Sequence, residues 1–277
     1  MSYDWQATLV LLATLIGASM VGNFLTRRIR AFDGMRDINR AEDSQKLAQE
    51  KYPPIVAANR KLGGITNLVF YAAVVPFIVT INPQPLWKIA VDIVAILMVY
   101  DFFYYLTHRF LFHGKGYFRR VHALHHQARK PTHIDAFYVH PLETFIGISL
   151  FMGSAALLGL FIGPFHIASL AVAVLVFQNL NIINHCHIRM DSFPGKTLSW
   201  ISVKHANHHK DMHQGNYSTI TLLYDKVFGT LGEGLACRLV FLFFCCRILA
   251  PVSPCWASYF FLGTQKEVGR QQGETTV

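Results

Sequence analysis

The sequence predicts an all-α integral-membrane protein, in which a helical bundle carries a helical cap that holds a histidine-rich dinuclear metal site. Three observations support this fold class. The chain has 277 residues, of which 52% are hydrophobic and only 15% are charged, whereas soluble domains carry about 25% charged residues. Several apolar runs are long enough to cross a hydrocarbon core of about 30 Å. All 14 histidines lie between His108 and His213, most of them close to the ends of those runs.

Five apolar stretches are expected to span the membrane as helices. The second contains Pro76, where we expect a kink, because proline cannot donate the backbone hydrogen bond that continues a helix. The third is interrupted by Asp92 and Asp101, which are costly in lipid unless they face the protein interior. The fourth and fifth form a hairpin that turns at Gly163 and Pro164. The five stretches cover residues 5–25, 64–81, 87–106, 144–163 and 165–183.

Basic residues concentrate between the first and second apolar stretches. Segment 26–63 contains nine of them, and the preference of basic residues for the cytoplasmic side places it in the cytoplasm. The net charge of +9 and the pI of about 9.4 then indicate contact with anionic lipid headgroups. We expect no nucleic-acid partner, because no binding motif for one occurs. Counting the spans returns the chain to the cytoplasmic side before His108 and again before His185, so the candidate ligands are expected on that face.

Three regions follow from this pattern. Residues 1–100 hold the N-terminal spans and the basic cytoplasmic loop. Residues 101–231 form the histidine-box domain, which includes the membrane hairpin at 144–183. Residues 232–277 form an apolar C-terminal segment and a polar tail. Within that region, residues 237–263 are apolar but broken by Arg247, Pro251 and Pro254, so they fit a re-entrant segment, an interfacial segment or a sixth span.

Two copies of the pattern H-x-x-H-H carry the strongest functional signal. They comprise residues 122–126 and 205–209, and the membrane hairpin separates them in the sequence. Positions i, i+3 and i+4 share one face of a helix, so each copy is expected to aim three imidazoles at roughly one point. Imidazole is a good ligand for iron, zinc or copper and a poor match for calcium or magnesium. The alternative for each copy is a solvent-exposed basic face.

Further histidines complete a set that suits two metal ions. His108 and His113 are five residues apart and do not share a face of a regular α-helix, so we expect the helix to end or unwind between them. Either His185 or His187 is expected to be a ligand, and we favour His185. His140 is either a ligand or a group that supports one. Nine imidazoles overcrowd one ion and suit two; the nine are His108, His113, His122, His125, His126, His185, His205, His208 and His209.

Other polar residues near these histidines have supporting roles or none. Asp101 lies about two helical turns before the first candidate ligand, on the same face, where it is placed to accept the second N–H of a ligand. The alternative is an interior carboxylate paired with Tyr104 or an arginine. His133 is expected in an ordinary loop and His166 at the membrane interface. His213 is either a supporting donor or a surface residue. Arg120, Arg129 and Lys130 are expected to form solvated basic surface, with lipid headgroup contacts as the alternative.

At these residues the chain resembles the fatty acid hydroxylase/sterol desaturase superfamily of integral-membrane enzymes. The resemblance spans residues 101–231 and ends on a run similar to the family's W-D-R-x-F-G-T, from which Tyr224 and Lys226 depart. The matching motifs are His108-Arg-Phe-Leu-Phe-His113, His122-Ala-Leu-His125-His126-Gln127, His140-Pro-Leu-Glu143, Asn184-His185-Cys-His-Ile-Arg189, His205-Ala-Asn-His208-His209, Asn216-Tyr217 and residues 224–230.

The resemblance implies two non-haem irons in the cap, with O2 as cosubstrate. It implies hydroxylation or desaturation of an unactivated C–H position in a membrane lipid, such as a sterol or a fatty acyl chain. Electrons would come from a separate electron-transfer protein, in a cytochrome b5- or ferredoxin-type reductase system. Glu143 and Asn216, with Asp101, are the residues expected to support the ligands. The membrane would be the endoplasmic reticulum in a eukaryote or the inner membrane in a bacterium.

Other function classes fit the residues less well. A membrane metallohydrolase usually pairs few histidines with a general-base glutamate, as in H-E-x-x-H, and the sequence contains no such motif. A metal transporter places its ligands near the middle of the membrane, whereas these histidines follow the ends of apolar runs. A non-enzymatic scaffold would not need the complete histidine set. The ligand set does not decide between hydroxylation and desaturation.

Overall fold

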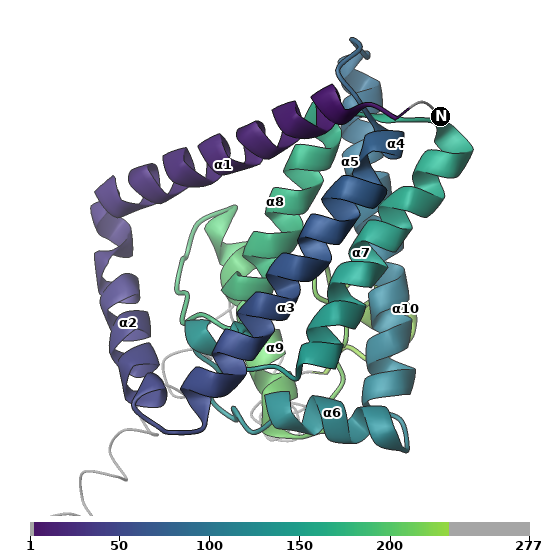
Figure 1. Ribbon diagram of the computed structural model, residues 1–277. Helices are drawn as coiled ribbons and strands as arrows, with labels where there is room; N and C mark the ends of the chain where they lie inside the picture. The colour runs from purple at the N-terminus through teal and green to yellow at the C-terminus, as the bar shows by residue number, and fades with distance from the viewer. Residues whose placement is uncertain (1–2, 233–277) are drawn as a thin grey trace, which may run out of the picture. The chain divides into compact units, whose positions relative to one another are not determined.

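The computed structural model describes residues 3–232, which are almost entirely helical (Figure 1). Two short parallel strands complete the described chain. In chain order the elements are α1 (Trp5–Arg28), the 3-10 helix η1 (Arg30–Phe32), α2 (Asp33–Leu47), α3 (Tyr52–Ala73), α4 (Val75–Ile78), β1 (Val79–Thr80), α5 (Leu86–Leu106), the π-helix η2 (Thr107–Phe112), α6 (Tyr117–His125), the 3-10 helix η3 (His133–Ala136), α7 (Pro141–Ile162), β2 (Phe165–His166), α8 (Ile167–Ile183), α9 (Gly195–Lys210) and α10 (Leu223–Val227).

Three helices of the described chain are long and apolar enough to cross a membrane. They are α1, α5 together with its continuation to Phe112, and α7; the apolar α8 is shorter, at 17 residues. The predicted spans at 5–25, 87–106 and 144–163 correspond to these three helices. The predicted span at 165–183 is helical only from Ile167, because residues 165–166 form β2, and α8 is shorter than the other three. The fold class is confirmed with them: an all-α membrane bundle.

The predicted span at 64–81 is wrong in its bounds. Helix α3 begins at Tyr52, with prolines in its first turn, where a missing N–H breaks no helical hydrogen bond. It ends at Ala73, and the predicted kink at Pro76 is a break between helices, followed by α4 and β1. At 22 residues α3 is long enough to span a membrane, but it is not apolar enough to count among the candidate spans of the described chain. Most of the predicted basic loop 26–63 is likewise helical.

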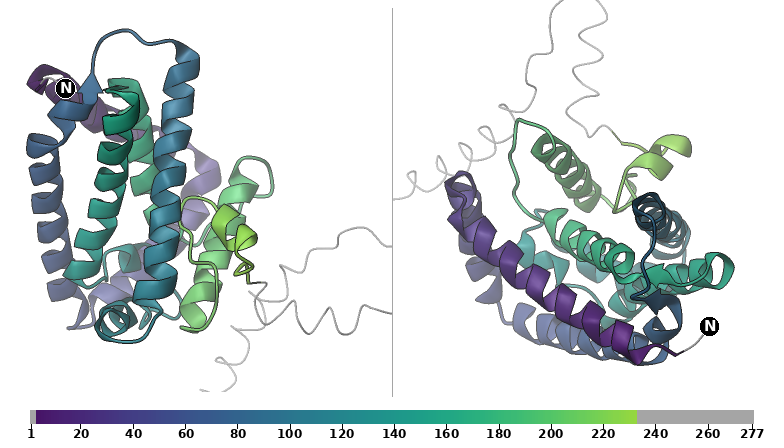
Figure 2. Two further views of the ribbon diagram at one scale, coloured as in Figure 1. Left: turned by 90° about the vertical axis from the view of Figure 1, so that its right-hand side faces the viewer. Right: turned by 90° about the horizontal axis from the view of Figure 1, so that it is seen from above.

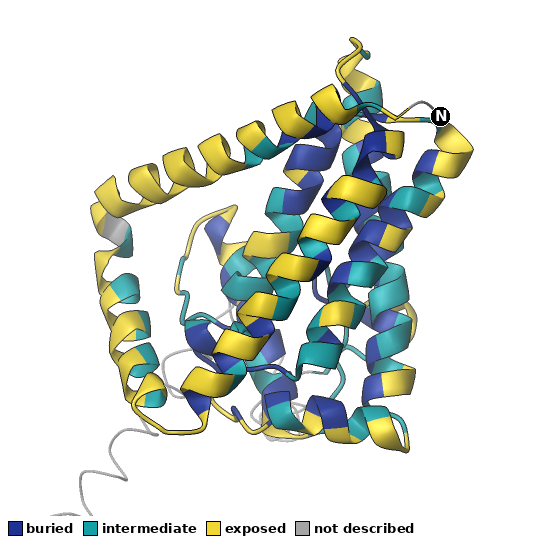
Figure 3. Ribbon diagram, in the orientation of Figure 1, coloured by how far each residue is buried: buried dark blue, intermediate teal, exposed yellow. Residues whose placement is uncertain are grey.

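The bundle is built around α5 and α7. Helix α7 packs against α3 and α5, and α8 packs against α5 and α1; Figure 2 shows these helices from two further directions. Helix α1 runs at a steep angle to the others, and most of its surface is exposed (Figure 3). Only Ala7, Thr8 and Leu11 of α1 are buried. Exposed apolar side chains on α1, α5 and α7 suit contact with lipid, whose interior is as apolar as leucine.

The topology brings the elements that carry the nine predicted ligands to one end of the bundle. Helices α5 and α8 finish at this end and α7 begins there, while α6 and α9 lie close by (Figure 1). At the opposite end β1 pairs with β2, and His166 caps α8 by accepting a hydrogen bond from the Ala168 N–H. The predicted segment 237–263 lies outside the described residues.

Helix α7 approaches α4 most closely at Gly159. A Cβ added there would lie 2.9 Å from Ile78 Cγ2, which is closer than packed side chains tolerate. We predict that Gly159→Ala lowers the free energy of unfolding by about 1–3 kcal/mol, measured by thermal unfolding in detergent. Gly153→Ala is the matched control on the same helix, because no described atom lies within 4 Å of a Cβ there. Equal losses in both variants would contradict the close approach.

Candidate metal centre

Nine histidines of the described chain form two compact groups, and they are the nine that the sequence predicts. Within each group, the nitrogen atoms that can bind a metal all lie within 4.8 Å of one another. The larger set is here called the five-histidine group and the smaller the four-histidine group. The five-histidine group contains His108, His113, His122, His126 and His208, and the four-histidine group contains His125, His185, His205 and His209.

Each H-x-x-H-H copy is divided between the two groups, which corrects the expectation that its three imidazoles converge on one point. In the first copy the i and i+4 residues belong to the five-histidine group and His125 belongs to the other. In the second copy the arrangement is reversed, and His208 is the residue that crosses over. The physical reason is the helical rotation of about 100° per residue, which separates positions i+3 and i+4 while keeping i and i+4 together.

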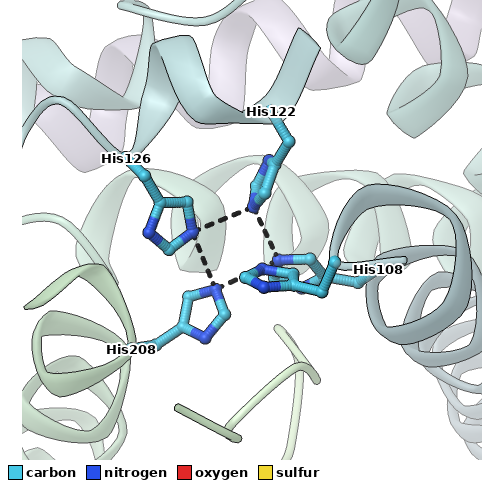
Figure 4. Close-up of side chains that lie close together, drawn as sticks. His108, His122, His126 and His208 are labelled. Carbon is cyan, nitrogen blue, oxygen red and sulfur yellow. Dashed lines mark hydrogen bonds between the residues drawn. The ribbon is translucent and has the colours of Figure 1, made fainter. Parts of the chain in front are cut away.

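A closed ring of four Nε2 atoms lies at the centre of the five-histidine group (Figure 4). The Nε2–Nε2 distance is 3.0 Å from His108 to His122, and also 3.0 Å from His122 to His126. It is 3.1 Å from His126 to His208, and 3.2 Å from His208 back to His108. His113 adds a fifth imidazole, whose buried Nε2 has no hydrogen-bond partner among the described residues.

The four-histidine group is joined in the same way. His185 Nε2 lies 3.0 Å from His125 Nε2 and 3.1 Å from His205 Nε2, and the Nε2 atoms of His205 and His209 are 3.1 Å apart. The two groups adjoin, because the rings of His126 and His209 stack with centroids 4.9 Å apart. The two groups therefore form one continuous cluster of nine imidazoles rather than two separate ones.

Most of these imidazoles use their other nitrogen, Nδ1, to hold their orientation. An Nδ1–H that donates to a fixed acceptor leaves Nε2 unprotonated, with its lone pair aimed at the other rings. Lone pairs that face each other at about 3 Å repel unless a cation lies between them, so this donor set fits metal ions. The Nδ1 contacts are His108 to Tyr217 O at 2.7 Å, His113 to Met212 O at 2.7 Å, His122 to Glu143 Oε1 at 2.7 Å, His185 to Asn181 O at 2.8 Å and His208 to Gly215 O at 2.8 Å.

A π-helix brings His108 and His113 into one group. Residues Thr107–Phe112 form this turn, and the His113 N–H donates to the His108 carbonyl at 2.9 Å. A π-turn closes over five residues rather than four, so positions i and i+5 come to the same side. The predicted unwinding of the helix between the two histidines is confirmed in this form.

Glu143 is a buried carboxylate that contacts one of the nine histidines. It lies in the first turn of α7, and its Oε1 accepts the hydrogen bond from His122 Nδ1. Its other oxygen is buried with no hydrogen-bond partner among the described residues. This is the contact expected of a carboxylate that orients a ligand imidazole.

Asp101 and Asn216 act on the backbone around the site. Both oxygens of Asp101 are occupied by the loop at 219–221, through three backbone N–H groups and the Thr221 hydroxyl. The Asn216 side chain donates to Lys204 O in α9 and accepts from the Gly232 N–H. Neither contact runs to a ligand imidazole. Both residues instead fix the loop that follows α9, whose carbonyls hold the Nδ1 atoms of His108, His113 and His208.

The remaining candidate histidines lie outside both groups. His140 caps α7, with its Nδ1 accepting from the Leu142 N–H. The backbone of His187 is paired with the side chain of Asn39 in α2. His133 donates to Asp43 and begins the 3-10 helix η3 rather than lying in a loop as predicted. His213 is exposed.

The sequence reasoning missed a polar clamp between α2 and the loop before α7. The buried Asp135 accepts hydrogen bonds from Tyr52 and Thr132 and forms an ion pair with Lys46. Tyr52 in turn stacks on Tyr138, whose carbonyl lies 3.4 Å from Nδ1 of His125. The residues 132–135 form a capping box, and the T-x-x-D pattern is a sequence signal that could have revealed it.

Burial keeps the imidazoles neutral. It lowers the pKa of His113 and of His122 to about 3. For His205 and His208, burial and then the neighbouring histidines hold the pKa well below the ordinary value. Neutral imidazoles offer their lone pairs to a metal without competition from protons.

An apolar helical bundle with nine neutral imidazoles at one end defines a class of membrane metalloprotein. Comparison with known families then places the chain: the fatty acid hydroxylase model matches residues 93–230, about half of the sequence. The chain belongs to this family. No solved structure matches it.

Curated relatives cover the same region. The chain is 31% identical over 152 residues to a putative methylsterol monooxygenase of Dictyostelium discoideum, covering 53% of each chain. It is 28% identical to methylsterol monooxygenase 1 of Rattus norvegicus, over 48% of this chain and 44% of the relative. It is 29% identical to a very-long-chain aldehyde decarbonylase of Oryza sativa subsp. indica, over 53% and 55%. The chain thus spans about half the length of the curated relatives it matches.

Removing the carboxylate that orients His122 should weaken metal binding. We predict that Glu143→Ala lowers metal affinity or activity about 10–100-fold, measured as metal content after dialysis against a graded chelator. Glu143→Gln keeps an acceptor oxygen and should recover part of the loss. Thr144→Ser, at the next position of α7, serves as the control for substitutions in this turn. A Glu143→Ala variant that holds metal as tightly as the wild type contradicts the proposed orientation.

The metal-free protein should become less stable on acidification. In the unfolded chain a histidine binds a proton below about pH 6.5, whereas folded His113 and His122 do so only near pH 3. The unfolded state therefore binds more protons between these values, and stability falls as the pH falls. Each such imidazole should cost about 1.4 kcal/mol at pH 5.5 relative to neutral pH. The measurement is the thermal midpoint of metal-free, chelator-treated protein as a function of pH. A His113→Gln variant should show a shallower dependence on pH. A thermal midpoint of the wild type that does not change with pH would contradict the prediction.

Proposed function

We propose that the protein is a membrane di-iron oxidoreductase that uses O2 to hydroxylate, or to desaturate, an unactivated C–H position of a membrane lipid. The observation that supports this most directly is the pair of adjoining histidine groups, nine neutral imidazoles in all, at the end of apolar helices. Family membership agrees with it, as do relatives named as methylsterol monooxygenases. Hydroxylation is the first choice, because a monooxygenase inserts an oxygen atom, and a sterol is the first lipid to test.

The donor set favours iron over zinc. Structural zinc takes four ligands in a tetrahedron, whereas the five-histidine group supplies five imidazoles. With metal–nitrogen bonds of about 2.1 Å, neighbouring ligands are about 3.0 Å apart in an octahedron and about 3.4 Å apart in a tetrahedron. The ring of Nε2 atoms has separations of 3.0–3.2 Å, nearer the octahedral value. Iron accepts six ligands and is redox active, which O2 chemistry requires.

The reaction balances with two electrons from outside the chain. Hydroxylation consumes the lipid, O2, two electrons and two protons, and yields the alcohol and water. Desaturation consumes the same reductant and yields an alkene and two waters. The two irons, when bound, supply the O2 reduction and the oxidising power. We propose an electron-transfer protein of the cytochrome b5 or ferredoxin type as the donor.

The protein's own residues would orient the ligands and exclude water. Glu143 and the backbone carbonyls fix the imidazole planes. On the side of the apolar helices, the Tyr104 ring lies 5.3 Å from the ring of His108, and Phe112 stacks on His122 at 5.2 Å. Aromatic rings on this side keep water from the place where a lipid chain would arrive. The lipid would enter from the bilayer, along the apolar helices.

We place the site on the cytoplasmic side, since the nine basic residues of segment 26–63 favour that side. In a eukaryote the membrane would be the endoplasmic reticulum, and in a bacterium the inner membrane. A metallohydrolase is the weaker alternative, because it needs a free general base and Glu143 is engaged with His122. The di-iron oxidoreductase would consume O2, whereas a metallohydrolase would not.

Replacing one ligand from each group tests the proposal. We predict that purified protein binds two irons per chain, and that His208→Ala and His205→Ala each lose metal and at least about 100-fold of activity, as loss of a core catalytic group does. Iron is measured by elemental mass spectrometry. Activity is measured by lipid mass spectrometry of cells with and without the protein, as the gain of one oxygen atom or the loss of two hydrogen atoms.

The matched control is His187→Ala, which removes a neighbouring histidine that lies outside both groups. It should keep both irons and the activity. Loss of iron in His187→Ala equal to that in His205→Ala would show that the ligand assignment is wrong. Full activity in His208→Ala would contradict the proposed oxidation chemistry itself.

A further inference from the structure

A cavity of about 220 Å³ opens onto the metal site from the end of the bundle. Its lining includes His126 from the five-histidine group and His209 from the four-histidine group, together with Arg129, Lys210 and Met212. One histidine of each group therefore lies close to solvent. His126 is 7% exposed and His209 is 1% exposed, so the imidazoles lie at the floor of the cavity rather than on the surface.

The two ligands at this floor are in contact with each other. Their rings stack with centroids 4.9 Å apart and an interplanar angle of 20°. An electron that arrives in the cavity therefore meets a histidine of either group in its lining. A lipid substrate would approach from the side of the apolar helices and would not use this cavity.

A second cavity, of about 400 Å³, lies against the start of α6. It is lined by Lys115, Arg119, Arg120 and Ala123. Ala123 is three residues before His126 and therefore on a neighbouring part of the helix surface, so the two cavities follow one another along the chain. We call the residues that line them the basic face.

The basic face carries five cationic side chains and one carboxylate. Lys115, Arg120, Arg129 and Lys210 are exposed and Arg119 is half-buried. The Lys210 ammonium also donates to Asn207. Asp211 is the acidic residue among the linings of both cavities, and its Oδ1 accepts from the backbone N–H of His213. The excess positive charge surrounds the opening that leads to the metal ligands.

We propose that the basic face is the docking surface for a small protein that donates one electron at a time and presents acidic residues around its redox centre. The proposal rests on the proposed function, in which two electrons must reach the irons for each O2 consumed. Complementary charge steers such a donor and sets its association rate. Redox encounters of this kind use small interfaces, which two adjacent cavities and their rims can supply.

The position of the charge favours a protein donor over a lipid headgroup. A headgroup site needs cations at the membrane surface but gains nothing from ligands of two metal groups at its floor. Electron delivery does gain from them, because transfer falls off steeply with distance from the metal. The basic face combines both features in one place.

Charge reversal on the basic face tests the proposal. Iron-loaded full-length protein in nanodiscs of neutral phosphatidylcholine is mixed with a reduced cytochrome b5 haem domain, and separately with a reduced plant-type ferredoxin, both acidic. The bimolecular rate of donor oxidation is followed by stopped flow. We expect Arg120→Glu and Arg129→Glu each to slow the faster donor about tenfold at low ionic strength, with smaller effects in high salt. Lys196→Glu, an exposed lysine at the start of α9, makes the same charge change outside both cavities and should leave the rate unchanged.

Reduction by dithionite separates this proposal from the proposed function. Variants that keep their iron and are reduced by dithionite at the wild-type rate, but accept electrons slowly from the protein donor, support the docking surface. Variants that accept electrons from both protein donors at the wild-type rate overturn it. If phosphatidylserine instead raises the thermal midpoint of the wild type but not of those variants, the face binds anionic lipid. The docking proposal is then likewise overturned. Wild-type protein that binds no iron, or whose dithionite-reduced irons are not reoxidised by O2 after the excess dithionite is removed, refutes the proposed function and is not a result about the basic face.

Discussion

The constraint on which the rest of the structure depends is the convergence of nine Nε2 lone pairs in a buried volume. Each imidazole is neutral, and its Nδ1–H is used elsewhere in most cases, so the inward nitrogens have no protons to share. Such an assembly is repulsive on its own and becomes favourable around cations. The helices, the π-turn and the loop after α9 can all be understood as the framework that holds these nitrogens in place.

The sequence predicted which histidines cluster better than it predicted their grouping. Six of the nine stand in the two rare H-x-x-H-H copies, and His108, His113 and His185 were added because they follow apolar runs; all nine lie in the two groups. The grouping was predicted wrongly, since i+3 and i+4 were treated as one direction on the helix. Because the two groups adjoin, the rotation of about 100° around the helix axis between these positions decides which group a histidine belongs to. His125 and His208 cross over for this reason.

The supporting residues were harder to predict because they act through the backbone. Glu143 contacts a ligand side chain and stands in a motif with a histidine, so its role was visible. Asp101 holds three consecutive N–H groups of a loop more than a hundred residues away, which no local pattern reveals. The bounds of α3 were missed for a different reason: hydropathy located the apolar half of the helix, while two prolines in its first turn set the true start well before it.

Metal binding at this site would be coupled to folding. Burying nine neutral imidazoles removes them from water, and among the described residues the inward-facing Nε2 of His113 has no hydrogen-bond partner. Each such buried group costs roughly 1–3 kcal/mol. Metal coordination offsets that cost only if the framework is already close to the bound geometry, since a loose framework would first have to be ordered. The many backbone contacts around the site, from the π-turn to the clamp at Asp135, supply that order before any metal arrives. The site is therefore as much a determinant of the fold at this end of the bundle as a product of it.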